Sequence, residues 1–235
     1  MIVANHTAGT SDSDLRDLWR MLTEMGALAE RHVARSVQAL VTADEVTARE
    51  VVEEDAAFDA IRKTIEERVV QRIVRRNTVA VNLREMFSFL RIAGELERIG
   101  ELARNIAHHM LTICAEELTR AQTLGLKHMA DAMAAQLRHV LDSFARRDVA
   151  MAVDVWTHDE DVDRRYAELC RELVGRMTEN PAAVTSAIHL LFCAKNLERM
   201  GDHATNIAEA VYYMVEGHRI SGERPKRDVT SMRRQ

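Results

Sequence analysis

The segment Ala194-Lys-Asn-Leu-Glu-Arg-Met-Gly-Asp-His-Ala-Thr-Asn-Ile-Ala208 occurs twice in this chain in closely similar form. The earlier copy runs from Ala93 to Ala107, and nine of the fifteen positions are identical at an offset of 101 residues. A second set repeats upstream at an offset of 104: Asp44, Val51, Asp55 and Asp59 match Asp148, Val155, Asp159 and Asp163. Self-similarity over this length predicts two tandem units of the same fold, each a hundred-odd residues long.

The composition decides the class of these units. The chain has 235 residues, of which 47% are hydrophobic, yet only two are proline and nine are glycine. Sheet proteins rich in turns need many more of both residues at their corners. Aromatic residues make up 4% of the chain, and a composition of this kind is typical of long helices packed along their length. The predicted fold class is therefore all-α.

Apolar spacing and capping signals predict six long helices. The first follows the polar start Ser11–Asp14, and Thr42-Ala-Asp-Glu45 has the form of a capping box that begins the second. Further boundaries are expected at Asn77-Thr78, Glu116–Gln122, Arg147-Asp148, Asn180-Pro181 and Gly217. Short connections make neighbouring helices antiparallel. We expect two similar three-helix bundles at residues 1–115 and 116–217, and a basic, disordered tail at 218–235.

Charge and cysteine usage indicate the setting. The formal net charge of −5 disfavours nucleic acid as a partner. Cys114, Cys170 and Cys193 are odd in number and form no CxxC pair, so neither a disulfide framework nor a zinc site is indicated. The amino terminus lacks the features of a signal peptide, and no stretch approaches the ~20 apolar residues of a membrane span. We expect a soluble, cytoplasmic protein.

The repeated segment carries oxygen-bearing side chains four residues apart, a spacing that places them on one helix face. These are Glu97, Glu101 and Asn105 in the first copy and Glu198, Asp202 and Asn206 in the second. The preceding helices carry Asp55 with Asp59, and Asp159 with Asp163. Residues of an antiparallel hairpin face each other when they are equally far from its turn. The pairs 59/97 and 55/101 share the midpoint 78, and the pairs 163/198 and 159/202 share 180.5, at the two predicted turns.

Four carboxylates at one level repel each other, and a bound cation would remove that cost. Oxygen ligands suit hard or borderline ions such as Mg²⁺, Mn²⁺ or iron. Gly100 and Gly201 lie between the carboxylates, where the absence of a side chain allows a neighbouring backbone or a metal to approach. The alternative is a solvated acidic face balanced by arginines such as Arg98 and Arg199.

These motifs resemble those of the PhoU family of phosphate-transport regulators. The resemblance is carried by Asn196–Glu209 with the preceding Asn180-Pro181, by the similar segment Glu95–Ala107, and by the paired aspartates of the helices before them. It covers about residues 12–217. It implies a PhoU-like fold of two three-helix bundles, homodimers, and multinuclear clusters of iron, manganese, magnesium or zinc bound by E/D-x-x-x-D motifs. It further implies a cytoplasmic negative regulator that links the phosphate ABC transporter, through its ATPase subunit, to a membrane sensor histidine kinase.

The metal motif of the family corresponds to Glu97 and Glu101, then to Glu198 and Asp202, and its partner motif to the four aspartates named above. Two positions depart from it: Glu101 replaces the usual aspartate, and His108 stands where the second copy has Glu209. The two sites are therefore not expected to be equivalent.

Two other functions fit a helical bundle rich in carboxylates. A ferritin-like di-metal protein needs Glu-x-x-His on two helices, and none of the ten histidines follows a glutamate at that spacing. A metal-free helical interaction protein is the remaining alternative. No nucleophile–base pair or open two-histidine metal site is evident, so we expect no enzymatic activity.

Overall fold

The computed structural model describes residues 6–75, 80–113, 120–157 and 160–222, and they are helical apart from short connections. The first half contains α1 (His6–Thr42), α2 (Glu45–Glu54), α3 (Ala56–Arg75) and α4 (Ala80–Met110). The second contains α5 (Arg120–Arg146), α6 (Val149–Thr157), α7 (Glu160–Glu179), the short 3₁₀ helix η2 (Pro181–Ala183) and α8 (Val184–Glu216). The prediction of an all-α protein built from two similar helical halves is confirmed.

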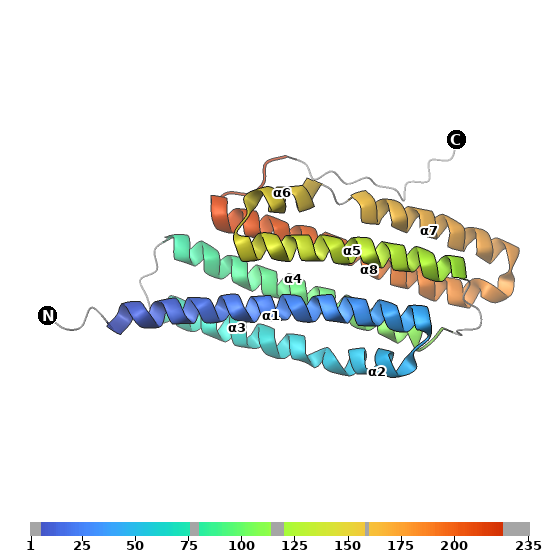
Figure 1. Cartoon of the computed structure of the whole chain (residues 1–235), viewed down its shortest axis with the longest axis horizontal. Helices are drawn as coiled ribbons and strands as arrows, with labels where there is room; N and C mark the ends of the chain where they lie inside the picture. The colour runs from blue at the N-terminus through green and yellow to red at the C-terminus, as the bar shows by residue number, and fades with distance from the viewer. Residues whose placement is uncertain (1–5, 76–79, 114–119, 158–159, 223–235) are drawn as a thin grey trace.

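The two halves pack side by side through their repeated helices. Figure 1 shows α4 and α8 in the middle of the molecule, with α1, α2 and α3 on one side and α5, α6 and α7 on the other. Helix α4 packs along α8, and α1 packs along α5. The buried apolar side chains of both halves form one continuous cluster. Over the described ranges, no helix combines the length and apolarity that are needed to cross a bilayer.

The same backbone features end the first helix of each half. Ala43 and Arg147, which are equivalent in the repeat, both have φ of 54°, the left-handed conformation that stops a helix. The next residue then caps the following helix: Asp44 accepts a hydrogen bond from Thr47 N at 3.1 Å, and Asp148 accepts one from Met151 N at 3.1 Å. Aspartate is a preferred N-cap because its oxygen satisfies a free amide of the first turn.

Three details of the predicted boundaries are wrong. Helix α1 begins at His6, before the expected polar start at Ser11–Asp14. The cap of the second helix is Asp44 rather than Thr42, whose hydroxyl donates back to Gln38 O at 2.8 Å within α1. The predicted single second helix is divided into α2 and α3 at Asp55, where Phe58 N donates to Asp55 O three residues back. In the second half, α6 and α7 are likewise separate helices.

Other expected boundaries agree with the structure. Asn180 caps η2 through Ala182 N, and Gly217 ends α8 with φ of 80° while its N–H donates to Tyr213 O. The predicted turn at Asn77-Thr78, Cys114, and the tail from residue 223 onward lie outside the described residues.

Candidate functional site

The acidic residues of the first half come together where α2, α3 and α4 meet. We call Asp55, Asp59, Glu97 and Glu101 the first acidic cluster. Asp55 interacts electrostatically with Asp59 and Glu101, and the carboxyl groups of Asp59 and Glu97 are in contact. The structure thus brings together the same pairs that are equidistant from the turn.

Two arginines from neighbouring helices bind this cluster. Arg104 Nη1 of α4 donates to Asp55 Oδ2 at 2.6 Å, and Arg62 Nη1 of α3 donates to Glu97 Oε2. The carboxylate side chains are well covered, since those of Asp55 and Glu97 retain 12% and 9% of their exposure. Glu101 has a third arginine, Arg98, at 2.6 Å on its own helix. The sequence did not predict the two pairs between helices.

Burial acts on the protonation of both covered carboxyl groups. It raises the pKa of Asp55, against the lowering effect of Arg104, and the negative charges of Asp59 and Glu101 add to the rise. Burial likewise raises the pKa of Glu97, with Arg62 opposing it and Asp59 adding to it. For both groups burial therefore disfavours the charged form by more than the neighbouring arginine favours it.

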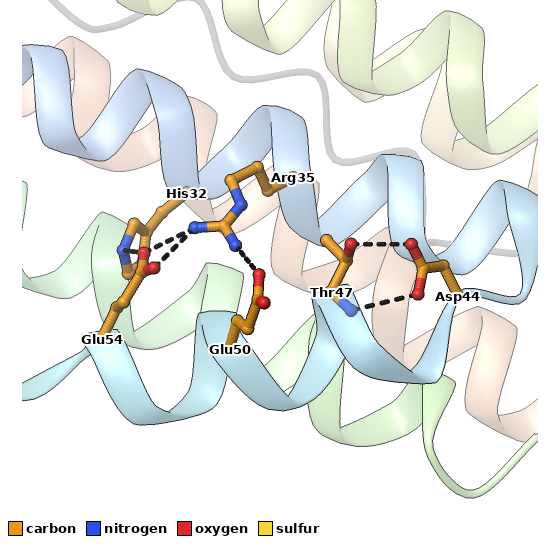
Figure 2. A network of polar contacts seen from close by, with 6 residues as sticks. All are labelled: His32, Arg35, Asp44, Thr47, Glu50 and Glu54. Carbon is orange, nitrogen blue, oxygen red and sulfur yellow. Dashed lines mark hydrogen bonds and ion pairs between the residues drawn. The ribbon is translucent and has the colours of Figure 1, made fainter.

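A polar network on α1 and α2 lies beside Asp55. Figure 2 shows Arg35 of α1 bridging Glu50 and Glu54 of α2, with distances of 2.5 and 2.7 Å. His32 is fully buried, and its Nε2 lies 3.3 Å from Glu54 Oε2. Its ring meets the ring of Phe58 edge to face, with 5.0 Å between centroids. Burial lowers the pKa of His32, although Glu54 and Asp55 oppose this shift, so the imidazole is held neutral.

Gly100 provides the space for that phenyl ring. A Cβ atom on Gly100 would lie 2.7 Å from Phe58 Cδ2, which is closer than side chains pack. The sequence predicts that this glycine admits a backbone or a metal. In the structure it admits the Phe58 side chain, which sets the distance between α3 and α4 beside the first acidic cluster.

The equivalent residues of the second half are Asp159, Asp163, Glu198 and Asp202, the second acidic cluster. Asp159 lies outside the described residues. Asp163 is on α7, and Glu198 and Asp202 are on α8, which packs against it. Glu198 has Lys195 Nζ 2.6 Å from its Oε2 and interacts with Tyr166 and Cys170 of α7. Asp163 and Asp202 also have polar or electrostatic interactions.

The two asparagines of the motif have different positions. Asn105 is half-buried on α4, one turn beyond Glu101. Asn206 of α8 donates through Nδ2 to Glu95 Oε2 of α4 at 3.1 Å, so its amide lies at the contact between the halves. His203 Nδ1 lies 2.7 Å from the same oxygen. Burial disfavours the charged form of Glu95, but the hydrogen bonds from His203 and Asn206 outweigh it and lower the pKa of the carboxyl.

The spacing of residues in the sequence did not predict further polar contacts that join the two halves. Arg91 of α4 pairs with Glu209 of α8 at 2.7 Å. Glu209, whose equivalent in the first copy is His108, therefore lies at the contact between the halves. Nδ1 of His109 lies 3.0 Å from Nδ1 of His189. Partners of this kind are 80 or more residues apart in the sequence, and only the packing of α4 along α8 brings them together.

The donor set suits a hard cation, because it consists of carboxylate oxygens. Asp55 Oδ1 is buried and has no hydrogen-bond partner among the described residues, as expected of an oxygen that awaits a ligand. Against this, within the described part of the chain no three His, Cys, Asp or Glu side chains are grouped so that they could hold a metal ion. In the first acidic cluster the arginines occupy the other oxygen of Asp55 and one oxygen of Glu97.

The doubled motif and the packing of α4 on α8 can be compared with known proteins. The family model described as "PhoU domain" matches residues 22–110 and again residues 126–211. The chain belongs to the PhoU family. It is 43% identical over 226 residues to the phosphate-specific transport system accessory protein PhoU homolog of Rhizobium meliloti, covering 96% of this chain and 95% of that protein.

Solved PhoU structures have the same fold. The crystal structure of PhoU from Pseudomonas aeruginosa superimposes with a TM-score of 0.84 at 35% identity, covering 88% of this chain and 99% of the other. The chain also superimposes on the crystal structure of the phosphate transport system regulatory protein PhoU from Streptococcus pneumoniae with a TM-score of 0.83. The sequence identity is 23%, and the match covers 90% of this chain and 99% of the other, which shows a likeness of fold. The PhoU-like fold is therefore confirmed. The expectation that the chain is not an enzyme is also confirmed, since the PhoU relatives are accessory and regulatory proteins.

Proposed function

We propose that this chain is a cytoplasmic regulator of phosphate transport that represses the phosphate-starvation response while phosphate is plentiful. The observation that carries this proposal is the PhoU domain, matched twice over most of the chain. The names of its relatives, an accessory protein of the phosphate-specific transport system and a phosphate transport regulatory protein, support it. A protein with this role acts by binding partners. Its partners are then the ATPase subunit of the phosphate ABC transporter, a membrane sensor histidine kinase and a second copy of the chain.

Metal binding is the second part of the proposal. Carboxylates from two helices of each half, with Asn105 and Asn206 nearby, are its candidate ligands. Bound ions would neutralise the mutual repulsion of these side chains and fix the helices that carry them, and iron, manganese, magnesium and zinc are the candidates. The buried, unpartnered Asp55 Oδ1 supports a ligand role in the first half. In the second half the support is the repeated spacing of Asp163, Glu198 and Asp202.

The regulatory proposal is tested by deleting the gene and measuring alkaline phosphatase activity in phosphate-rich medium. We expect a rise in activity that the wild-type gene on a plasmid reverses. A silent reporter in the deletion strain, with every paralogous gene also removed, would refute the regulatory role. Complementation by the Glu198→Gln/Asp202→Asn variant then asks whether the second acidic cluster is needed for repression, with Arg91→Gln as a control at an exposed pair outside both clusters.

The metal proposal has its own test, because a metal-free interaction protein could also regulate. Protein purified without chelators or a nickel column is analysed for metal content, and is then dialysed against chelator and titrated with Mn²⁺. We expect bound metal in the first measurement and a higher melting midpoint with Mn²⁺ in the second, since a ligand of the folded state stabilises it by mass action. If no metal is bound and Mn²⁺ does not raise the melting midpoint, the protein is a metal-free regulator.

A further inference from the structure

Two histidines from opposite halves meet at one end of the contact between α4 and α8. His109 lies in the last turn of α4 and His189 in the second turn of α8, and Figure 1 shows these two helix ends at the same end of the molecule. The two Nδ1 atoms are 3.0 Å apart, and the ring centroids are 5.3 Å apart with 56° between the ring planes. The sequence showed no open two-histidine metal site, because the members of this pair are 80 residues apart.

The tandem repeat does not account for this pair. The offset of 101 residues places Ala210 at the position of His109 and Ser88 at the position of His189. Ala210 and Ser88 are both buried, so the equivalent positions near the opposite ends of the two helices hold small, covered side chains. The packing of α4 along α8 therefore does not require two imidazole rings, and the pair is a feature of one end of the contact only.

Neighbouring groups hold His109 in place while leaving the pair at the surface. The ring of Phe192 stacks on the imidazole, with 2° between the planes and 5.3 Å between the centroids. The backbone carbonyl of His109 accepts hydrogen bonds from Thr112 N at 3.0 Å and from Ile113 N at 3.1 Å. Both histidines are half-buried, and Phe192 is 53% exposed. An ion from solution can therefore reach the two rings without separation of the helices.

The chemistry and the spacing of the two nitrogens suit a metal ion. Imidazole is a ligand for zinc, copper and nickel, whereas Mg²⁺ and Mn²⁺ prefer oxygen. Burial, His189 and His108 all lower the pKa of His109, which keeps its ring neutral and its lone pair available at about pH 7. Two nitrogens bound to one ion at about 2.0–2.1 Å, with an angle of about 90–110° between the bonds, lie about 2.9–3.4 Å apart. The observed separation of 3.0 Å falls in this range.

We propose that His109 and His189 bind a borderline divalent cation such as Zn²⁺ through their Nδ1 atoms, and that this ion joins the two halves of the chain. Without the ion the two Nδ1 atoms share one proton in an N–H···N hydrogen bond, and the ion releases that proton to solvent. Over the described ranges no three His, Cys, Asp or Glu side chains are grouped to hold an ion, so water completes the coordination of an ion bound by this pair. The inference does not rest on the proposed function, because its ligands are nitrogens rather than the carboxylates.

Zinc titration of the full chain tests the inference. The wild type, His109→Gln/His189→Gln and His108→Gln are dialysed against chelator and titrated calorimetrically with Zn²⁺ in excess Mg²⁺, which competes for oxygen ligands and leaves imidazole free. We expect the wild type and His108→Gln to bind one more Zn²⁺ per chain than His109→Gln/His189→Gln. His108 is the matched control because it is exposed and successive residues of a helix do not face each other. Zn²⁺ should also raise the melting midpoint of the wild type by more than that of His109→Gln/His189→Gln.

Equal Zn²⁺ binding by the wild type and His109→Gln/His189→Gln, including none by either, would overturn the inference. Zinc that is lost in Glu198→Gln/Asp202→Asn and retained in the histidine variant would also overturn it, and would leave the proposed carboxylate role intact. If the histidine variant fails to fold, His108→Gln is loaded with one equivalent of Cu²⁺ and studied by electron paramagnetic resonance. Hyperfine coupling to two nitrogens would support the histidine pair, and coupling to fewer than two would refute it.

Discussion

The two halves of this protein have the same backbone plan and different charges at the same place. Asp44 and Asp148 cap equivalent helices after residues with the same left-handed φ of 54°, and α4 and α8 carry carboxylates at the same spacing of four residues. The first half adds arginines from neighbouring helices where the second half has a tyrosine and a threonine. The difference teaches that a tandem repeat can keep its helices and its acidic motif while the side chains that neutralise the motif diverge.

A second difference between the halves lies where they join. Trp19 of α1 stacks on Phe144 of α5, with ring centroids 4.2 Å apart, and meets Phe89 of α4 edge to face at 5.2 Å. Its indole N–H donates to Glu85 Oε1 at 3.1 Å. The position equivalent to Trp19 in the repeat is Thr123. The tryptophan of this contact therefore has no aromatic counterpart at the equivalent position of the second half.

The largest effect is expected from removing that contact. Trp19→Ala should lower the free energy of unfolding by about 3 kcal/mol, since it empties a stacked aromatic site and leaves Glu85 without the indole donor. Thr123→Ala, the equivalent change in the second half, should cost less than about 1 kcal/mol. Urea denaturation of both variants measures the difference. Equal losses would mean that Trp19 does not distinguish the halves.

Gly100 tests the packing beside the first acidic cluster. Gly100→Ala should destabilise the protein by about 1–3 kcal/mol, because the added methyl group displaces the buried ring of Phe58. Gly201→Ala is expected to cost less, since Val162 stands where the first half has Phe58. Gly94→Ala is the control. Beyond its own turn of helix, nothing in the described part of the chain lies within 4 Å of the place that a methyl group would take there, and alanine should add about 0.5–1 kcal/mol of helix stability. Thermal melts in the presence of chelator measure the order of stability of the three variants.

Mild acid should affect the first half through His32. Burial lowers the pKa of this imidazole in the folded protein, so the unfolded chain binds its proton first as the pH falls through about 6.5. Stability is therefore lost from that point down to the lower folded pKa and is constant beyond it. His32→Gln, which copies Gln136 of the second half, should reduce the loss of melting temperature between about pH 7.5 and about pH 5.5.

His109 adds to the same acid sensitivity, because burial and the neighbouring His189 lower its pKa. The melting temperature of His32→Gln should therefore still fall as the pH is lowered, and adding His109→Asn should reduce that remaining fall in part. A pH profile that is identical in the wild type and His32→Gln would contradict a neutral, buried imidazole at position 32.

The smallest effect is expected at the exposed arginine of the first cluster. Arg98→Ala removes an i,i+3 pair with Glu101 on the surface of α4, where the arginine is 56% exposed. The change should cost less than about 0.5 kcal/mol. Arg104→Ala should cost about 1–3 kcal/mol, since it leaves the covered Asp55 carboxylate without its partner. Similar values for the two variants would remove the distinction between surface and interhelix arginines on which the comparison of the halves depends.

The sequence predicted much of the architecture because its signals are local. The stop at Gly217 and the turn at Asn180-Pro181 depend on the conformations open to glycine and proline, and both are confirmed. The meeting of Asp59 with Glu97 followed from counting residues on either side of a turn. The division between α2 and α3 was missed, since Asp55 carries no breaker signal. The break is marked by the hydrogen bond from Phe58 N to Asp55 O, which joins residues only three apart.

By itself, the sequence determined that the chain is helical, that it is a tandem repeat, where most helices end, and which carboxylates share a level, because each depends on spacing within one helix or one hairpin. Tertiary structure alone decided which cations reach those carboxylates, that Gly100 accommodates Phe58, and that Asn206 and Glu209 bind the opposite half. These contacts join helices whose separation in sequence carries no information on their distance. Long side chains such as those of Arg62 and Arg104 can point to several neighbours, and only the packed helices select one.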